Sequence, residues 1–416
     1  MRNSPFWWVL IGFMLLLDWY FFQALKIVSL SAPGRARMMI YIIYWVLSLA
    51  AIITLIILPY IHFDKQTRFT RTALFSIIAG FFFAKLIASL FFLIDDLRRG
   101  VQWLWEKFSS PKTKPAGLQV EDRISRSVFL SWMGMIAGGG MFGTLVYGFG
   151  NKYRYQVKRI KLSYANLPAA FKGLRVVHIS DIHSGSFNNK QAVIKGVSRI
   201  MKEKPDLILF TGDLVNSVAD EMEDYMDVFN KLEAPLGVYS TLGNHDYGDY
   251  ASWDNEADKA VNLEKLKQIH ATLGWRLLMN EHVELARGTD KIALLGIENW
   301  SAKARFPKYG DMKKAHAGTS TYPFKILMSH DPSHWKAQVL DDYPDIDLML
   351  SGHTHGMQFG VEIPGFKWSP VQYVYKEWAG LYEKQAQKLY VNRGFGFIGY
   401  PGRVGILPEI TVLEFS

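Results

Sequence analysis

The chain has 416 residues, which is enough for two domains, and it contains no cysteine, which excludes disulfides, thiolate metal sites and cysteine nucleophiles. Its formal net charge of +9 is concentrated in residues 1–150, which hold 15 Lys and Arg against 7 Asp and Glu. Residues 151–416 hold 32 and 31, so this half lacks the basic face that nucleic acids require, and we expect no nucleic-acid binding.

Four apolar stretches within residues 1–150 predict helices that cross a membrane. The expected spans are residues 5–25, 38–60, 72–94 and 128–149. The second and fourth contain no charged residue, and each exceeds the roughly 20 residues that a helix needs to cross a bilayer core. Four such stretches in so short a segment argue against buried helices of a soluble domain. We therefore predict a four-helix transmembrane region and a multi-pass membrane protein.

Two charged residues interrupt the first and third spans, namely Asp18 and Lys85. A charge that faces lipid is costly, so each side chain is expected to face a neighbouring helix. One interpretation is a buried ion pair or an intramembrane functional site. The other, which we favour, is that each residue only fixes helix packing, or that Lys85 reaches toward the membrane surface.

Positively charged residues between the spans predict the orientation of the chain. Seven lie between the third and fourth spans: Arg98, Arg99, Lys107, Lys112, Lys114, Arg123 and Arg126. Basic loops favour the cytoplasmic side, so the part after the fourth span is expected outside the cytoplasm, in a bacterial-type inner membrane. Residues 123–130, RISRSVFL, resemble a twin-arginine export signal with Ser127 in place of the second arginine, and they favour the same side.

A different pattern begins after residue 150, where short apolar runs alternate with amphipathic stretches. We expect residues 151–171 to form a linker and residues 172–416 to form a domain. The expected strands are residues 174–180, 206–210, 237–242, 291–297, 324–329, 347–351 and 388–392, and the expected helices are residues 188–204, 219–232 and 258–272. This order predicts an α/β domain in which two sheets pack together with helices outside.

Residues that commonly bind metals follow five of the predicted strands. They are Asp181 and His183, then Asp213, then Asn244 with His245 and Asp246, then His330, and finally His353 and His355 in the sequence SGHTHG. Loops at the carboxyl ends of strands converge in α/β sheets, so these side chains are expected to meet. Carboxylate, imidazole and amide oxygen without sulfur suit Mn, Fe, Zn or Co, and two such cations can activate water for attack on phosphorus.

The ordered set D-x-H, G-D, G-N-H-D, H and G-H-T-H resembles the calcineurin-like metallophosphoesterases over about residues 172–416. The resemblance implies a two-sheet β-sandwich flanked by helices, two divalent transition metal ions, and hydrolysis of phosphoesters by a metal-activated hydroxide. The sequences HISDIH, GHTHGMQ and PEITVLEF are similar to a membrane-anchored bacterial branch related to UDP-2,3-diacylglucosamine hydrolases.

The same resemblance assigns roles by position in the motifs. Asp181, His183 and His355 would hold one metal, Asn244, His330 and His353 would hold the other, and Asp213 would bridge them. His245, oriented by Asp246, would protonate the leaving oxygen or hold a phosphate oxygen. His178 and His334 lie near the ligands in sequence but outside the pattern, and we expect them to be structural.

Two arginines near the C-terminus, Arg393 and Arg403, are candidates for contacting a phosphate, with ordinary surface arginines as the alternative. The aromatic segment 357–384 is expected to be either a flap that contacts the membrane or an acyl chain, or a loop that covers the core.

The sequence thus predicts a membrane-anchored phosphodiesterase or phosphatase whose substrate lies at the membrane surface or is linked to a lipid. One alternative is a UDP-2,3-diacylglucosamine pyrophosphatase of lipid A biosynthesis. Another, of a different class, is a receptor or scaffold that binds metal without catalysis.

Overall fold

The computed structural model describes residues 5–61, 68–109 and 126–416, and the chain divides into two compact units, Met1–Tyr147 and Gly148–Ser416. Of the basic residues that predict the orientation, Lys112, Lys114 and Arg123 lie outside the described residues. Each unit is considered by itself.

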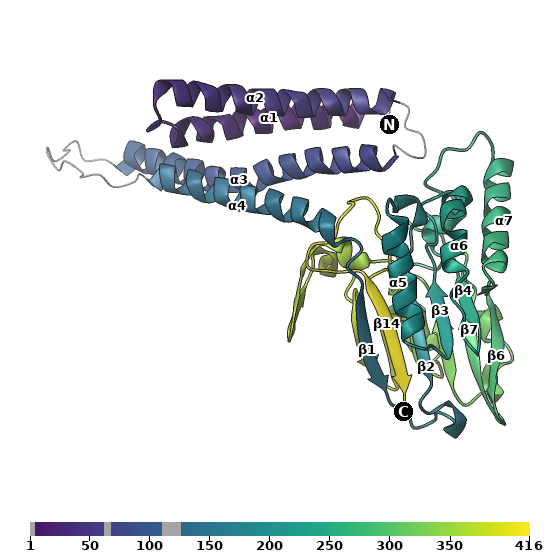
Figure 1. Ribbon diagram of the computed structural model, residues 1–416. Helices are drawn as coiled ribbons and strands as arrows, with labels where there is room; N and C mark the ends of the chain where they lie inside the picture. Colours follow the sequence, from purple (N-terminus) through teal and green to yellow (C-terminus); the bar gives the residue numbers. More distant parts are fainter. Residues whose placement is uncertain (1–4, 62–67, 110–125) are drawn as a thin grey trace. The chain divides into compact units, whose positions relative to one another are not determined.

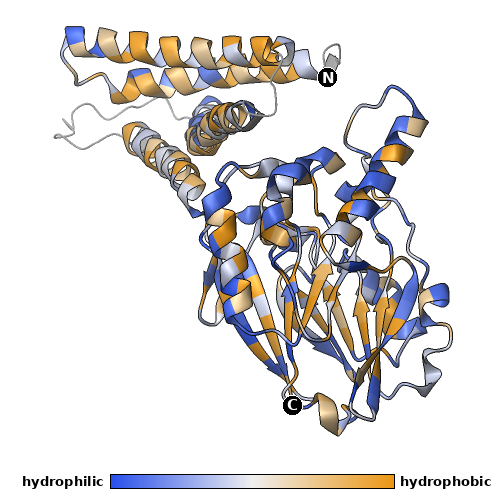
Figure 2. Cartoon of the chain, turned by 45° about the vertical axis from the view of Figure 1, so that its right-hand side comes forward, coloured by the Kyte–Doolittle hydropathy of each residue, from blue (hydrophilic) through white to orange (hydrophobic). Residues whose placement is uncertain are grey.

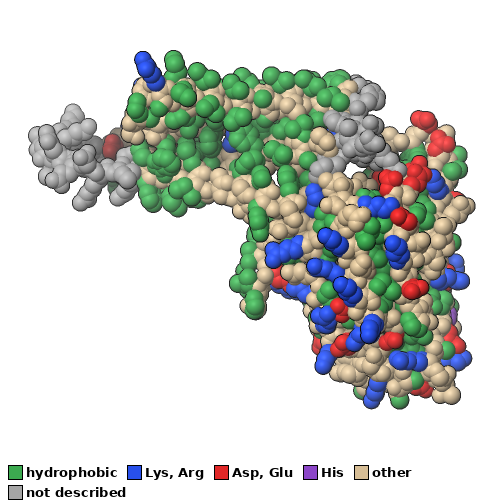
Figure 3. Space-filling view, viewed as in Figure 1, with side chains coloured by type: hydrophobic (Ala, Val, Ile, Leu, Met, Phe, Trp, Pro, Cys, Tyr) green, Lys and Arg blue, Asp and Glu red, His purple; other side chains and the backbone are tan. Residues whose placement is uncertain are grey.

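The first unit contains the four predicted apolar helices. They are α1 (Pro5–Val28), α2 (Gly34–Ile57), α3 (Arg68–Ser109) and α4 (Arg126–Gly148), and each is long and apolar enough to cross a membrane. Figure 2 shows hydrophobic residues along these helices, and in Figure 3 their outer surface is covered by hydrophobic side chains. A surface of this kind is compatible with lipid and not with water, as predicted.

Helix α3 is longer than expected, because it continues to Ser109 instead of ending near residue 94. Arg98 and Arg99 therefore lie on a helix and not in a loop, where they form i,i+3 and i,i+4 ion pairs with Asp95 and Asp96. The predicted span ended just before the charged residues Asp95 and Asp96, whereas the ion pairs that these residues form stabilise further helical turns.

A buried polar cluster joins the first three helices of this unit. Lys85 forms an ion pair with Asp18, and its Nζ also donates to Ser48 Oγ at 2.7 Å. Ser48 Oγ donates to Asp18 Oδ1 at 3.1 Å, and the Tyr44 hydroxyl donates to the Asp18 carbonyl at 2.8 Å. Asp18 is fully buried and Lys85 is 2% exposed. The pair that we considered and did not favour from the sequence is therefore present, and Lys85 does not reach the surface.

Breaking this pair should strongly destabilise the helices. We expect Asp18→Ala to lower the free energy of unfolding by about 3–5 kcal/mol, because Lys85 would be left as an uncompensated buried charge. Unfolding of the full chain in detergent would measure this effect, with the exposed Glu106→Ala as a control that changes little. The double variant with Asp18→Lys and Lys85→Asp restores a pair of opposite charges. If it is no more stable than the less stable of these two single variants, loss of the ion pair is not the cause of the destabilisation.

Small residues allow α3 and α4 to approach closely. A Cβ added to Gly134 would lie 2.7 Å from the Ala88 carbonyl oxygen, and one added to Gly138 would lie 2.4 Å from that of Ala84. Both helices thus present small residues four positions apart at the contact, the arrangement by which membrane helices pack without side-chain interlocking.

The second unit is built from two six-stranded sheets, as predicted (Figure 1). The first sheet has the strand order β1 (Gln156–Leu162), β14 (Glu409–Phe415), β2 (Arg175–Ile179), β3 (Leu207–Thr211), β4 (Val238–Thr241) and β5 (Arg276–Leu277). The second has the order β12 (Gly380–Lys384), β13 (Gln387–Val391), β9 (Leu348–Ser351), β8 (Lys325–Met328), β7 (Asp290–Gly296) and β6 (Glu281–Arg287). All seven strands predicted from the sequence are present.

Three hydrophobic layers hold these sheets and helices together. Alternate residues of the central strands, such as Val176 and Leu209 of the first sheet and Leu294 and Ile326 of the second, fill the space between the sheets. The outer face of the first sheet packs against α5 (Lys190–Lys202), α6 (Met226–Phe229) and α7 (Glu256–Thr272), and that of the second packs against α8 (Met312–His316) and α9 (Leu340–Asp342). Strands buried on both faces read as continuous apolar runs, which is why the sequence predicted them.

The predicted linker, residues 151–171, is instead part of the domain. It contains β1, which pairs in parallel with β14 from Gln156 opposite Glu409 to Leu162 opposite Phe415. This edge strand has the charged sequence QVKRIKL, with only Leu162 fully buried, so it lacks the apolar run by which central strands are recognised.

Because most strands within each sheet are parallel, their carboxyl ends lie at the same edge of that sheet. In the first sheet β2, β3, β4 and β5 are parallel, and in the second β7, β8, β9 and β13 are parallel. The loops after β2, β3, β4, β8 and β9 are those that carry the predicted metal-binding residues. They therefore leave the sandwich at the carboxyl ends of both sheets.

Part of the aromatic segment covers the domain, as one of the two alternatives expected, whereas contact of its exposed part with a membrane or an acyl chain stays a prediction. Its hairpin, β10 (Val361–Ile363) and β11 (Phe366–Trp368), exposes Ile363 and Phe366. Downstream, Tyr375 and Trp378 are buried in a small hydrophobic cluster with Ile406. Part of the segment therefore covers the domain and part of it is open.

The first residues of the second unit contact a loop near its C-terminus. The Gly148 carbonyl accepts a hydrogen bond of 2.9 Å from the Arg403 amide, and the Phe149 ring lies 5.5 Å from the Tyr400 ring. A Cβ on Gly148 would come within 2.2 Å of the Tyr400 hydroxyl, so only glycine fits in this contact. Gly148 and Phe149 are thus packed within the second unit.

Candidate metal centre

The structure brings the seven predicted metal ligands together in two groups. They come from the loops after five strands: Asp181 and His183 after β2, Asp213 after β3, Asn244 after β4, His330 after β8, and His353 and His355 after β9. Six of them are buried and His353 is partly buried. This clustering was the central expectation from the sequence, and their role as ligands is taken up below as a proposal.

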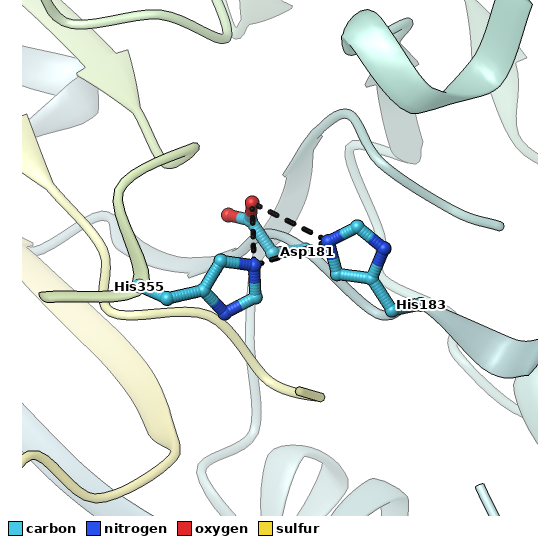
Figure 4. A group of neighbouring side chains, drawn as sticks. All are labelled: Asp181, His183 and His355. Carbon is cyan, nitrogen blue, oxygen red and sulfur yellow. Dashed lines mark hydrogen bonds and ion pairs between the residues drawn. The ribbon is translucent and has the colours of Figure 1, made fainter. Parts of the chain in front are cut away.

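The first group consists of Asp181, His183 and His355 (Figure 4). His355 Nε2 lies 3.2 Å from Asp181 Oδ1, and His183 Nε2 lies 3.0 Å from His355 Nε2. His183 Nε2 also lies 4.0 Å from Asp181 Oδ1. Two ring nitrogens and a carboxylate oxygen converging in a buried space are the donor set that a divalent cation requires.

The second group consists of Asp213, His330 and His353, with Asn244 beside them. His353 Nδ1 lies 3.2 Å from His330 Nε2 and 2.8 Å from Asn244 Oδ1. The Asn244 amide nitrogen donates to the Tyr250 hydroxyl at 3.0 Å, which directs the amide oxygen toward the histidines. The donor atoms again converge without sulfur.

Asp213 connects the two groups through a single oxygen. Its Oδ2 lies 3.5 Å from His183 Nε2 of the first group and 3.2 Å from His330 Nε2 of the second. Its Oδ1 accepts a hydrogen bond of 2.9 Å from the His245 amide, which fixes the carboxylate. Burial acts to raise the pKa of Asp213, but the neighbouring histidines, His330 foremost, hold it well below its usual value. The carboxylate is therefore ionised.

Unusual backbone conformations direct these side chains inward. Five of the seven residues have positive φ angles: Asp181 (53°), His183 (48°), Asp213 (60°), His353 (71°) and His355 (50°). This region is unfavourable for residues with a Cβ and is populated where the surrounding structure holds it. Hydrogen bonds from the Asp181 amide to the Gly212 carbonyl and from the His183 amide to the Asp213 carbonyl provide that support.

Each of three histidines is oriented by a hydrogen bond on the far side of its ring. His183 Nδ1 lies 3.2 Å from the Val215 carbonyl, and His330 Nδ1 lies 2.7 Å from the Thr211 carbonyl. A carbonyl can only accept, so Nδ1 carries the proton and Nε2 keeps its lone pair for the site. His353 is turned the other way, with Nε2 2.9 Å from the Tyr375 hydroxyl and Nδ1 toward the site.

Two site predictions about arginines are wrong. Arg393 is 4% exposed and forms ion pairs with Glu409 and Glu362. Arg403 is fully buried, and its guanidinium donates to the carbonyls of His355, Arg393, Gly394 and Gly396. Neither guanidinium is available to a phosphate, because carboxylates bind that of Arg393 and backbone carbonyls bind that of Arg403.

Arg403 has a structural role at the first group, since it binds the backbone of His355 and lies 3.2 Å from the Nδ1 of its ring. We expect Arg403→Lys to lower metal affinity by about 10- to 100-fold, as loss of such outer partners commonly does. Competition with a chelator would measure the affinity, and Arg159→Lys, an exposed arginine paired with Glu203, is the matched control. Equal affinities in the two variants would contradict this role.

The prediction that Asp246 orients His245 is also wrong. The Asp246 carboxylate is buried and accepts backbone N–H groups of Gly243, Asp213, Leu214 and Val215, so it supports the ligand loops. His245 is oriented by a backbone carbonyl, because its Nδ1 lies 2.7 Å from Asn216 O. Its ring lies 4.9 Å from that of His183 and 4.3 Å from that of Tyr250, at the edge of the centre.

His178 and His334 have the contacts of structural residues, as expected. Burial lowers the pKa of each to about 4, so both are neutral, and they bond to Thr211 and to Ser329 and Gln338 respectively. Sequence reasoning missed Tyr250 and Tyr375, which contact Asn244 and His353. A tyrosine in a loop carries no spacing signal that could have identified either.

Comparisons with known proteins agree with this geometry. Residues 1–151 match the family described as "Probable Calcineurin-like phosphoesterase, transmembrane domain", and residues 174–357 match the family "Calcineurin-like phosphoesterase". The helical part thus matches a transmembrane domain found in calcineurin-like phosphoesterases, and the α/β part matches the phosphoesterase domain itself.

Three relatives span animals and bacteria. A "Transmembrane protein with metallophosphoesterase domain" of Danio rerio is 33% identical over 273 residues, which is 64% of this chain and 59% of that protein, less than two thirds of its length. The "Uncharacterized metallophosphoesterase YkuE" of Bacillus subtilis is 30% identical over 71% of this chain and 98% of its own length. The "UDP-2,3-diacylglucosamine pyrophosphatase LpxG" of Chlamydia trachomatis is 30% identical over 61% of this chain and 88% of its own length.

Proposed function

Because the chain belongs to the calcineurin-like phosphoesterase family, whose members are metal-dependent hydrolases, we propose that it cleaves a phosphoester at the centre described above. The four apolar helices anchor it in a membrane. The substrate we propose is a phosphodiester or phosphomonoester at the membrane surface, with a lipid-linked phosphoester as the favoured class.

Two divalent transition metals from Mn, Fe, Zn and Co would occupy the centre. Asp181, His183 and His355 would hold one, Asn244, His330 and His353 would hold the other, and Asp213 would contact both. When bound, such a pair lowers the pKa of a water and offsets charge on the phosphoryl oxygens. The observation that carries this proposal is the Oδ2 atom of Asp213, which faces one histidine of each group.

The protein's own contribution is to orient the ligands and to handle a proton. His245 is held through Nδ1 by the Asn216 carbonyl, which leaves its Nε2 available, and its ring lies 4.9 Å from that of His183. We assign it the protonation of the leaving oxygen, with a contact to a phosphate oxygen as the alternative role.

Hydrolysis of bis-p-nitrophenyl phosphate tests the proposed activity. The full chain in detergent should lose activity after treatment with a chelator and regain it with Mn²⁺. Metal-loaded protein that binds the cations stoichiometrically but cleaves neither this ester nor phosphomonoesters would instead favour a receptor or scaffold that binds metal without catalysis.

We further propose that the domain lies outside the cytoplasm of a bacterial-type cell. Since the chain has no cysteine, a single cysteine at the exposed position Lys172 can report the side. An impermeant thiol reagent should label it in intact cells, whereas labelling only after lysis would place the domain inside. The printed activity of the LpxG relative, a UDP-2,3-diacylglucosamine pyrophosphatase, is the alternative function, and it would be favoured by an inside location.

A further inference from the structure

We propose that Arg305, assisted by Lys303, binds a second anionic group of the substrate next to the phosphoester at the metal centre. This inference rests on the proposed function and narrows the substrate to compounds with adjoining anionic groups, of which diphosphate diesters are the favoured class. Both residues lie in the loop of residues 297–311, which follows β7 at the same strand ends as the ligand loops.

The loop is ordered by bonds at both of its ends. The Asn299 carbonyl accepts the amides of Tyr309 and Gly310, and its side-chain amide donates to the Pro307 carbonyl at 3.0 Å. Further along the loop, the Ala302 amide donates to Ser333 Oγ and the Phe306 amide donates to the Lys303 carbonyl, each at 3.0 Å. The loop is therefore joined at its base, and the turn that contains Arg305 is closed by a backbone hydrogen bond.

A single aromatic ring separates Arg305 from a proposed metal ligand. The guanidinium carbon lies 4.6 Å from the centre of the Phe306 ring. That ring in turn packs edge-on against His353, with 4.8 Å between the ring centres. Stacking on Phe306 keeps the guanidinium extended while its N–H groups stay free to bind an anion.

Lys303 adds a second positive charge near the same ligand. Its Nζ lies 5.4 Å from the centre of the Tyr375 ring, and the Tyr375 hydroxyl lies 2.9 Å from His353 Nε2. Both cations are therefore close to side chains that contact His353.

Neither cation has an acidic partner among the described residues. Other basic side chains of the domain do have one, as Lys265 has in Asp220 and Glu223. Arg305 is exposed, and no carboxylate of residues 126–416 forms an ion pair with it or with Lys303. An uncommitted arginine beside a phosphoester centre is suited to a second phosphate, which a planar guanidinium binds with two parallel hydrogen bonds.

Binding of UDP-glucose, a diphosphate diester, tests the inference directly. Calorimetry on the full chain loaded with Mn²⁺ in detergent should give a dissociation constant about 10- to 100-fold higher for Arg305→Gln than for the unchanged protein, the usual effect of losing a charge-assisted hydrogen bond. The KM for bis-p-nitrophenyl phosphate, which has one anionic group, should change less than about threefold. Arg305→Lys should recover part of the affinity, because it restores the charge without the bidentate geometry.

The matched control is Lys308→Gln in the same loop, because the Nζ of Lys308 lies over a different ring, 4.6 Å from the centre of Trp300. This variant should change the dissociation constant of UDP-glucose and the KM for bis-p-nitrophenyl phosphate by less than about twofold. The inference is overturned if the unchanged protein does not bind UDP-glucose, if Arg305→Gln binds it as well as the unchanged protein does, or if the losses for the two compounds are equal. If the protein hydrolyses no phosphoester, the proposed activity is wrong. Even then, weaker UDP-glucose binding in Arg305→Gln and not in Lys308→Gln would support the anion site.

Discussion

Replacing Asp213 by asparagine should lower kcat by a factor of about 1,000, which corresponds to roughly 4 kcal/mol of transition-state stabilisation. The substitution keeps the size of the side chain but removes the negative charge from Oδ2, the atom that faces His183 and His330. An amide bridges two cations poorly, and two positive ions with no shared anion repel each other. We therefore expect the variant to retain fewer than two metals per chain.

Metal analysis together with bis-p-nitrophenyl phosphate hydrolysis would measure this effect. Asp249→Asn is the matched control, because this carboxylate lies in the same part of the chain but forms a partly exposed ion pair with Lys259. The control should keep its activity within about twofold. A fully active Asp213→Asn variant with its full metal content would refute the bridging role and, with it, the proposed centre.

Replacing His245 by glutamine should reduce turnover by about 10²- to 10⁴-fold without loss of metal, because the residue is proposed to move a proton and not to bind a cation. The size of the effect should depend on the leaving group. A p-nitrophenolate leaves without protonation, whereas the alkoxide released from glycerophosphocholine requires a proton. The loss should therefore be small for bis-p-nitrophenyl phosphate and large for glycerophosphocholine.

This comparison separates the two roles left open for His245. If the residue instead holds a nonbridging phosphate oxygen, the losses for the two substrates should be similar. Tyr250→Phe shows whether the ring beside His245 is sufficient to position it. This variant keeps the aromatic ring that packs against His245 and removes only the hydroxyl bonded to Asn244. A loss of bound metal in His245→Gln would contradict both roles.

The clustering of the seven side chains was foreseeable from the sequence because strand ends in α/β domains have a fixed relation to one another. An apolar run such as residues 206–210 identifies a buried strand, and the residue types that follow it identify the chemistry. The positive φ angles of residues such as Asp181 and His353 left no trace in the sequence, since they arise from backbone bonds between distant loops.

Two of the errors concern residues whose partners are backbone carbonyls or amides. Asp246 and Arg403 were expected to act on a histidine and on a phosphate, but each binds backbone groups supplied by loops that meet only in the folded chain. Backbone groups are the same at every position, so a sequence cannot indicate which of them will be near. The substitute candidate, Arg305, is recognised only from its unpaired charge and its place beside Phe306.

In the membrane unit, too, the helices could be predicted from composition, whereas the contacts between them could not. Its four helices follow from hydropathy alone, whereas the contact between Asp18 and Lys85, 67 residues apart, depends on how the helices associate. The extra length of α3 depends on the ion pairs that its acidic and basic residues make after the apolar stretch ends.

The attachment of Gly148 to Arg403 limits where a water-soluble fragment of this protein can start. A truncation at residue 172, the predicted domain boundary, would strip the outermost strand from the first sheet and expose the edge of β14. It would also leave the Arg403 amide without its acceptor, next to the guanidinium that steadies His355. A fragment intended for crystallisation should therefore retain Gly148 and everything after it, because Arg403 bonds to both Gly148 and His355.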